Sequence, residues 1–203
     1  MNHDVRQFKS LAVALKEMER FVRSGRPLET GKPFENFGGM RPREAWGNWL
    51  VCAVMDELNQ SSEFAICSDP TGGDGIILDR TTGETWLTEH VMVSRFGVDQ
   101  TSDAETLILK AIQDKCRKGP TYGRGKTLIV FLNADVGAWS PNSVARRLPD
   151  PLHFAAVWVV SLEGVVGGER VYALTDLNLA HGGLHVRISE NFDAWTVTPV
   201  PRR

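Results

Sequence analysis

Two carboxylates near the middle of the 203-residue chain are the side chains best suited to chemistry. Asp74 follows a glycine-rich turn and precedes a strand-like run at 76–78, and Glu89 lies inside a longer strand-like run at 85–93. A carboxylate within an apolar strand is unfavourable unless it is paired, hydrogen-bonded or bound to a cation. Two carboxylates that meet across a hairpin also repel each other unless a cation or a proton lies between them. The pattern therefore predicts that Asp74 and Glu89 bind Mg²⁺ or Mn²⁺, an ion that would polarise a substrate phosphate and activate an attacking water.

Apolar periodicity and turn residues predict the elements that must position these side chains. Spacings of three and four predict helices, and short apolar or alternating runs bounded by turn residues predict strands. The segment 26–41 contains several prolines and glycines without periodicity, so it is predicted to be a wrapping loop. The predicted helices are 5–22, 42–59, 103–118 and 142–147, and the predicted strands are 64–67, 76–78, 85–93, 128–132, 154–162, 170–174, 184–188 and 195–200.

This order of elements predicts an α/β or α+β fold with a single mixed β-sheet flanked by helices. The strands at 76–78 and 85–93 are close enough in sequence to form a hairpin, whereas the helix that follows 85–93 predicts a parallel crossover to 128–132. The uninterrupted apolar run at 128–132 predicts a strand that is buried on both faces. We expect two parts, residues 1–41 with the first helix and the wrapping loop, and residues 42–203 with the carboxylates.

The element order helix, three strands, helix, strand, with Asp74 before the second strand and Glu89 on the third, resembles the PD-(D/E)xK nuclease superfamily. The resemblance covers roughly residues 43–174 and implies that residues 42–203 form a restriction-endonuclease-like domain with an αβββαβ core. It also implies that Asp74 and Glu89 are metal ligands, that Glu44 on the preceding helix assists them, and that the substrate is DNA.

One position departs from the family motif. Two residues after the glutamate, where the family usually has lysine, this chain has Val91, and His90 lies in between. Strand alternation places His90 on the opposite face from Glu89, so it could replace the lysine only with a bulge, and a buried, hydrogen-bonded histidine is the simpler interpretation. Lys110 or Lys115 on the following helix could reach back to supply the charge, although both are most simply solvated. The motif therefore indicates either a displaced lysine or an altered, inactive site.

Each carboxylate also has a purely structural interpretation. Asp74 follows glycines and could cap its own turn. Glu89 could be a charge on an edge strand that discourages aggregation. Glu44 lies near the start of a helix, where a negative charge interacts favourably with the helix dipole, and for this residue alone the structural interpretation is the one we favour.

Other motifs in the sequence give weaker evidence of function. The segment 123–127 ends in Gly-Lys-Thr but leads into a strand, whereas a phosphate-binding loop leads into a helix. His181 and His185 have the spacing of a zinc-binding helix, but the two glycines between them disfavour a helix. Basic clusters within 110–126 and at 146–147 and 202–203 could contact nucleic-acid phosphates, or could be ordinary solvated charges.

Composition limits the classes of protein that the chain can belong to. The formal net charge of −2 and the pI of about 6.2 exclude a protein that depends on bulk attraction to phosphate. Three widely spaced cysteines without a CxxC pair favour a reducing cytoplasm. A charged amino end and a longest apolar run of only 154–160 predict neither a signal peptide nor a membrane span.

The first hypothesis is a cytoplasmic, metal-dependent nuclease that hydrolyses phosphodiester bonds of DNA, with Mg²⁺ or Mn²⁺ as its cofactor. The alternative is a catalytically inactive nuclease-fold subunit that binds nucleic acid or a protein partner. A third hypothesis is a small α/β enzyme or effector unrelated to nucleases, in which Asp74 and Glu89 are turn and edge residues. A homodimer is also expected, because cleavage of both strands of a duplex conveniently takes two sites and twofold dimers are common.

Overall fold

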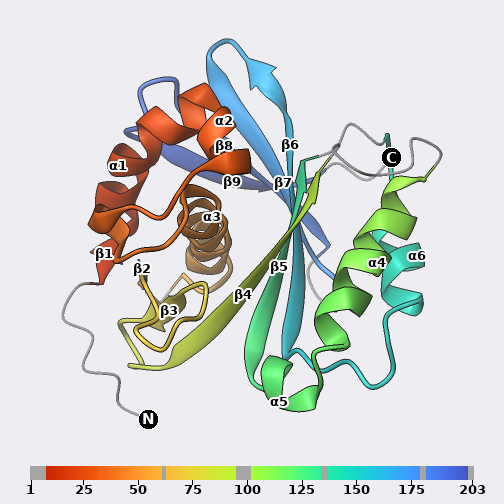
Figure 1. Ribbon diagram of the computed structural model, residues 1–203. Helices are drawn as coiled ribbons and strands as arrows, with labels where there is room; N and C mark the ends of the chain where they lie inside the picture. The colour runs from red at the N-terminus through yellow and green to blue at the C-terminus, as the bar shows by residue number, and fades with distance from the viewer. Residues whose placement is uncertain (1–7, 61–62, 95–101, 134–136, 179–181, 201–203) are drawn as a thin grey trace.

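The computed structural model describes residues 8–60, 63–94, 102–133, 137–178 and 182–200, which form one open nine-stranded β-sheet with helices on both faces (Figure 1). Neighbours in the sheet follow the order of the chain. Strands β4, β5 and β6 run parallel, and the other neighbouring pairs are antiparallel. The prediction of a single mixed sheet is confirmed. The strands are β1 (Lys9–Ser10), β2 (Phe64–Cys67), β3 (Ile76–Asp79), β4 (Thr85–Ser94), β5 (Lys126–Asn133), β6 (Ala156–Val166), β7 (Glu169–Asp176), β8 (Gly183–Ile188) and β9 (Trp195–Pro199).

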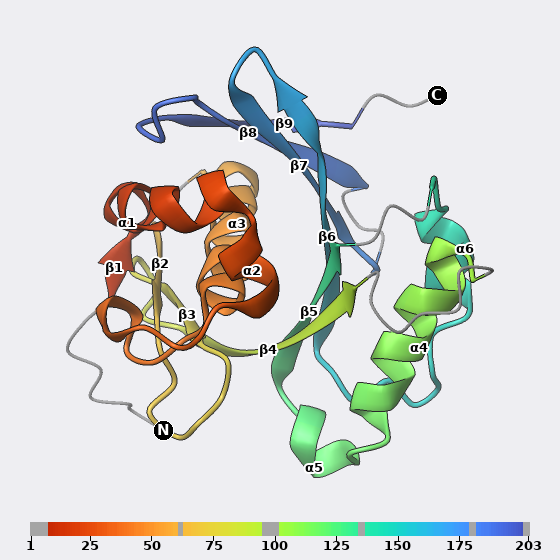
Figure 2. The same cartoon turned by 45° about the horizontal axis from the view of Figure 1, so that its top comes forward.

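The helices divide into two groups that cover opposite faces of the sheet. Helices α1 (Leu11–Ser24), α2 (Arg26–Thr30) and α3 (Pro42–Leu58) lie on one side, and α4 (Ala104–Cys116), α5 (Pro120–Gly123) and α6 (Pro141–Arg146) lie on the other (Figure 1). A short 3-10 helix, η1 (Glu35–Phe37), lies between α2 and α3 in the chain. The sheet curls around α3, which contacts β2 to β5 and β7 to β9 (Figure 2).

Helix α3 is the central element of the larger core. Pro42 occupies its first turn, where the missing N–H has no helical partner to lose. Trp46 and Trp49 are fully buried and stack with their ring centroids 4.9 Å apart. A helix that is enclosed on nearly all sides has apolar residues all round, and Gly47 and Asn48 depart from that composition because they face β4 and the start of β3.

Strand β4 belongs both to the β3–β4 hairpin and to the parallel pair β4–β5, and these two units position the carboxylates. It forms the predicted antiparallel hairpin with β3, and after α4 the chain returns as β5, parallel to β4, as predicted. Residues 128–132 of β5 are all buried. Ile129 and Phe131 enter the core on the α3 side, and Leu128, Val130 and Leu132 enter a second core on the α4 side. The prediction of a strand buried on both faces is therefore confirmed.

Two predictions near the amino end are wrong, namely the start of the first helix and the assignment of 26–41 as a loop. Lys9 and Ser10, which the apolar periodicity assigns to the first helix, instead pair with β2, and the helix begins at Leu11. This pairing provides hydrogen-bond partners for backbone groups of β2 at the edge of the sheet. The apolar periodicity of 5–22 contains no information about pairing with a distant strand. The segment 26–41 is not a simple loop, because it contains α2 and η1, which are too short to show a helical repeat.

Some predictions concern residues outside the described ranges, namely the spacing that begins at His181 and the basic pair at 202–203. Cys52, Cys67 and Cys116 are buried and unlinked. Among the helices of the described ranges, none combines the length and the apolar character that crossing a bilayer demands.

Candidate active site

A polar pocket of about 460 Å³ lies where the β3–β4 hairpin meets the amino end of α3 and the side chain of Lys115 from α4. Five of the six predicted site residues line it: Glu44, Asp74, Glu89, His90 and Lys115. Lys110 does not, because it is exposed on another side of α4. Five residues of α-helix correspond to a rotation of about 140° beyond a full turn, so Lys110 and Lys115 cannot face the same site.

Asp74 is held by the neighbouring strand. Its Oδ2 accepts a hydrogen bond of 2.6 Å from the backbone N–H of His90, and its carbonyl oxygen accepts one of 3.2 Å from Nδ2 of Asn48. Burial raises the pKa of Asp74 to about 6, and the negative charges of Glu89 and Glu44 contribute in the same direction. Asp74 is therefore a carboxylate held near other carboxylates, where a bound cation would be most stabilising.

The turn before Asp74 is organised by a different aspartate. Asp69 accepts hydrogen bonds through Oδ1 from the backbone N–H and the hydroxyl of Thr71, and through Oδ2 from the N–H of Gly73. The described hydrogen bonds thus assign the turn-capping role to Asp69, and they direct the carboxylate of Asp74 across to β4.

Glu89 lies on the α4 side of the sheet, within a cluster of cations. Its Oε1 contacts Nζ of Lys115 at 2.5 Å, and its Oε2 lies 3.8 Å from Nζ of Lys126. Burial raises the pKa of Glu89, but hydrogen bonds from Lys115 and Tyr122 and the two lysine charges outweigh it, so the net pKa is lowered. Strand β4 pairs with both β3 and β5. The β3 ladder ends at Leu87, so within the described strands Glu89 itself pairs only with Leu128 of β5, but its side chain is buried and paired with lysine and is not a solvated edge-strand charge.

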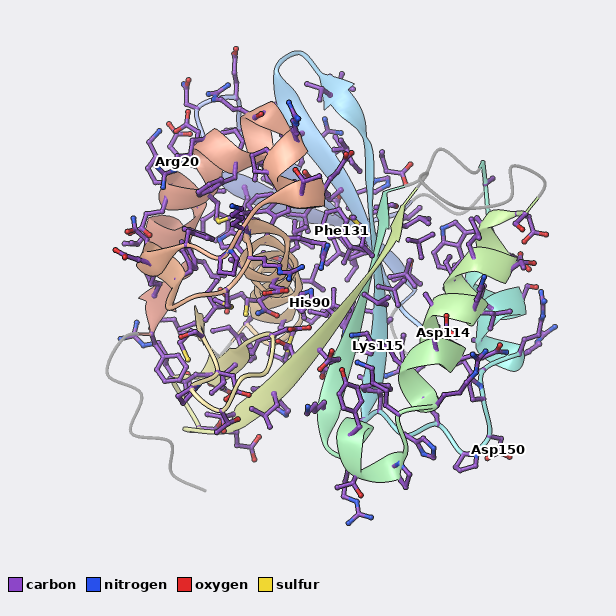
Figure 3. The ribbon with its side chains drawn as sticks, viewed as in Figure 1. Arg20, His90, Asp114, Lys115, Phe131 and Asp150 are labelled. Carbon is purple, nitrogen blue, oxygen red and sulfur yellow. The ribbon has the colours of Figure 1, made fainter. Side chains whose placement is uncertain are left out.

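His90 faces the opposite side of β4, toward α3. Figure 3 shows His90 and Lys115 on the two sides of this strand. Nε2 of His90 lies 3.0 Å from Oδ1 of Asn48. Because Nδ2 of Asn48 donates to the Asp74 carbonyl, Oδ1 is the acceptor and Nε2 of His90 carries the proton. Burial, followed by the charges of Arg43 and Lys115, lowers the pKa of His90 well below its usual value, so the ring is neutral.

Two glycines make this arrangement possible. A Cβ at Gly47 of α3 would lie 2.7 Å from Cε1 of His90, so only glycine lets the imidazole pack against the helix. Gly75 has a φ of +144°, and a Cβ there would lie 2.2 Å from Nδ2 of Asn48. The amide can therefore reach the Asp74 backbone only because residue 75 has no side chain.

Glu44 combines a structural role with a place in the pocket. Its Oε2 accepts a hydrogen bond of 2.8 Å from the backbone N–H of Arg41, which forms part of a capping box at the start of α3. This is the helix-terminus role favoured by the sequence. The same carboxylate lines the pocket and raises the pKa of Asp74 through its charge.

The sequence did not identify several residues that complete the site. Asn48 holds Asp74 and His90, Tyr122 hydrogen-bonds to Glu89, and Arg43 lines the pocket beside Glu44. The Gly47-Asn48 pair in an otherwise apolar helix was the available signal, because a buried asparagine requires polar partners. Tyr122 had no comparable signal, since only the return of α5 toward β4 brings it to Glu89.

Two carboxylates of the pocket, Asp74 and Glu89, could bind a hard divalent ion such as Mg²⁺. Within the described ranges no group of three or more histidine, cysteine, aspartate or glutamate side chains is arranged as a metal cage. Mg²⁺ is usually bound by one or two carboxylates with waters and substrate phosphate completing its coordination, and it does not need such a cage. Asp74 and Glu89 line one pocket and interact electrostatically, so they are the two residues that would hold the ion.

No protein-family model, curated protein or solved structure matches this chain. The assignment of function therefore rests on the geometry of the pocket.

Proposed function

We propose that this protein is a metal-dependent nuclease that hydrolyses phosphodiester bonds of DNA at the pocket containing Asp74 and Glu89. The observation that carries the proposal is that Asp74, whose pKa is raised to about 6, and Glu89 line one pocket together with a lysine that reaches across from the next helix. A carboxylate whose pKa is raised by burial and by a neighbouring carboxylate is typical of catalytic sites.

The arrangement of α3, β2, β3, β4, α4 and β5 supports a restriction-endonuclease-like core. These elements follow the order αβββαβ, with an antiparallel hairpin, a parallel crossover and one helix on each face. Asp74 precedes β3 and Glu89 lies within β4, which are the positions of the two acidic residues in that family's motif. Lys115 from α4 contacts Glu89. It would replace the motif lysine, whose usual position is occupied by Val91 in this chain.

Each residue has a distinct part in the proposed reaction. A bound Mg²⁺ or Mn²⁺ would polarise the scissile phosphate and lower the pKa of the attacking water. Asp74 and Glu89 would bind that ion, and Lys115, which contacts Glu89, would place a positive charge near the negative charge that develops on the phosphate. Asn48 and His90 act as positioning residues, because they fix the backbone and the carboxylate of Asp74 without carrying charge themselves.

One observation favours the inactive alternative. Val91, at the place of the motif lysine, packs in the core on the α4 side, and Lys115 already neutralises Glu89. A pocket in this state could hold nucleic acid without cutting it. By contrast, the hypothesis of an unrelated protein with Asp74 as a turn cap and Glu89 as a solvated edge charge is disfavoured, because Asp74 bonds to β4 and Glu89 is buried against Lys115.

The proposal is tested by incubating the full chain with supercoiled plasmid and with single-stranded DNA in Mg²⁺, Mn²⁺ or EDTA. We expect metal-dependent cleavage by the wild type and a loss of roughly 10³-fold, about 4 kcal/mol of activation free energy, in both Asp74→Asn and Glu89→Gln. Glu63→Gln is the matched control, because Glu63 is exposed and paired with Arg80 outside the pocket.

The outcomes separate the candidates. Cleavage that persists in Asp74→Asn and Glu89→Gln would assign the activity to a contaminant or to another site. Wild-type protein that binds these DNAs but cuts none of them with either metal would support the inactive subunit.

A further inference from the structure

A second, smaller pocket of about 180 Å³ adjoins the candidate active site. It is formed by the segment 28–33, which comprises the end of α2 and the three residues after it, together with Arg41 and Arg43, and both of these arginines also line the larger pocket. Its lining includes three cations, Lys32, Arg41 and Arg43, and one carboxylate, Glu29. The smaller pocket is therefore a cationic recess that opens beside an acidic one.

Arg43 is the unusual residue of this recess. Its side chain is only 13 % exposed, yet the nearest oxygen of Glu44 lies 3.9 Å from Nη2, beyond hydrogen-bond distance. Nη1 faces the sulfur of Met92 at 3.8 Å, a weak acceptor. Within the described part of the chain, Nε is buried and has no hydrogen-bond partner.

The buried guanidinium of Arg43 therefore lacks strong hydrogen-bond acceptors. Burial of a charged group is unfavourable unless an opposite charge and hydrogen bonds compensate for it. Lys115 contrasts with it, since that equally shielded cation lies 2.5 Å from a carboxylate oxygen. The fork of N–H donors in arginine matches the oxygens of a phosphate, which would supply the missing acceptors.

We propose that Arg43, with Lys32 and Arg41 at the rim, binds a phosphate group of the nucleic-acid backbone immediately beside the Asp74–Glu89 pocket. The choice of a backbone phosphate rests on the proposed function, whereas binding of the phosphate group itself rests on the geometry of Arg43. Arg41 and Arg43 line both pockets, so the two sites are neighbours and one nucleic-acid strand can reach both. Arg43 would thus position the strand for cleavage.

The test measures binding in EDTA, so that cleavage is not required. Fluorescence anisotropy of labelled single-stranded and duplex oligonucleotides gives Kd for wild type, Arg43→Gln, Arg43→Lys and the control Arg80→Gln. Arg80 carries the same charge but is half-exposed and paired with Glu63 at 2.8 Å. We expect Arg43→Gln to weaken binding roughly 10- to 100-fold, Arg43→Lys to be intermediate, and Arg80→Gln to change Kd less than about twofold.

Inorganic phosphate is the second probe. Phosphate should raise the Tm of the wild type and of Arg80→Gln but not that of Arg43→Gln, and it should compete with the oligonucleotide for the wild type. Without phosphate, Arg43→Gln should melt no lower than the wild type, because the substitution removes an incompletely compensated buried charge. If Arg43→Gln fails to fold, the comparison of Arg43→Lys with Arg80→Lys decides the question.

The results distinguish this inference from the proposed function. Equal Kd values for Arg43→Gln and Arg80→Gln would overturn it even if the wild type cuts DNA. Binding that depends on Arg43 in a protein without nuclease activity would support the phosphate site and reject the nuclease. Stabilisation by inorganic phosphate without oligonucleotide binding would overturn the nucleic-acid source of the phosphate.

Discussion

Two adjacent residues of β4, Glu89 and His90, occupy opposite environments. Glu89 faces α4, where Lys115 and Lys126 surround a charged carboxylate. His90 faces α3, where an amide and a glycine enclose a neutral ring. Both line the same pocket, but the first side of the strand is built from charges on long side chains and the second from neutral groups fixed by packing.

This difference indicates that the two faces of one strand have different roles: the α4 face carries charged groups that can take part in a reaction, and the α3 face carries neutral groups that stabilise the fold. A neutral, buried imidazole beside two positive charges cannot serve as the missing cation, because its protonation is opposed by burial and by Arg43 and Lys115. Lys115, whose ammonium group contacts the Glu89 carboxylate, can serve as that cation. We therefore expect substitutions on the α3 side to act mainly on stability, and substitutions on the α4 side to act mainly on activity.

The largest expected effect is on the α3 side. Asn48→Ala leaves Nε2 of His90 and the carbonyl of Asp74 without their partner in a buried site, which should lower the free energy of unfolding by about 3 kcal/mol. For a domain of this size, Tm should fall by roughly 6–12 °C, measured by calorimetry or circular dichroism.

Asn59→Ala is the matched control for Asn48→Ala. Asn59 lies at the carboxyl end of the same helix and is exposed, although its Nδ2 also donates to a carbonyl. Its substitution should change stability by no more than about 0.5 kcal/mol. If Asn48→Ala and Asn59→Ala lowered the free energy of unfolding equally, the buried contacts on the α3 side of β4 would contribute no more to stability than an ordinary helix end.

The next effect is on the α4 side. Lys115→Gln removes the cation that contacts Glu89 and should reduce metal-dependent cleavage roughly 10- to 100-fold, since one stabilising donor is lost from the site. Lys110→Gln, on the same helix but outside the pocket, should change the rate less than about twofold. The measurement is the initial rate of plasmid cleavage at several pH values.

The pH profile of these variants also tests the contrast between lysine and histidine. If Lys115 supplies the charge, the rate of the wild type should not fall as pH rises through the usual pKa of histidine near 6.5. A fall in that range, together with wild-type rates for Lys115→Gln, would assign the charge to His90 and reverse the comparison.

The sequence predicts the framework of this fold well. The short strand-like runs at 76–78 and 85–93, bounded by turn residues, and the apolar run at 128–132 identify strands, because burial of a short segment imposes those patterns directly. Lys9 and Ser10 show the limit, since pairing at a sheet edge depends on a distant strand. Their assignment to a helix was wrong for that reason.

The candidate site is only partly accessible from sequence. Asp74 and Glu89 could be selected because charge in an apolar run is unusual, and both lie in one pocket. The choice between Lys110 and Lys115 depends on the rotation of α4 over the sheet, which spacing alone does not determine. Arg43 and Asn48 act through partners that are far apart in the chain, so only the fold identifies them.

The smallest expected effect concerns the two carboxylates themselves and is visible in the pH dependence of stability. The folded chain holds the proton of Asp74 up to about pH 6, whereas the ordinary pKa is 3.8, so the free energy of unfolding should fall as pH rises through this interval. Asp74→Asn keeps an acceptor for the N–H of His90 but removes the charge, and at pH 7 it should be more stable than the wild type by about 1 kcal/mol after allowance for partial exposure. The difference should vanish below about pH 4.

Glu89→Gln should behave in the opposite way, because the lowered pKa of Glu89 stabilises the fold at neutral pH and that stability is lost in acid. Thermal unfolding of both variants from pH 8 down to well below the ordinary glutamate pKa of 4.5 measures this contrast, and parallel curves would mean that the two carboxylates do not form the unequal pair on which the proposed metal site depends.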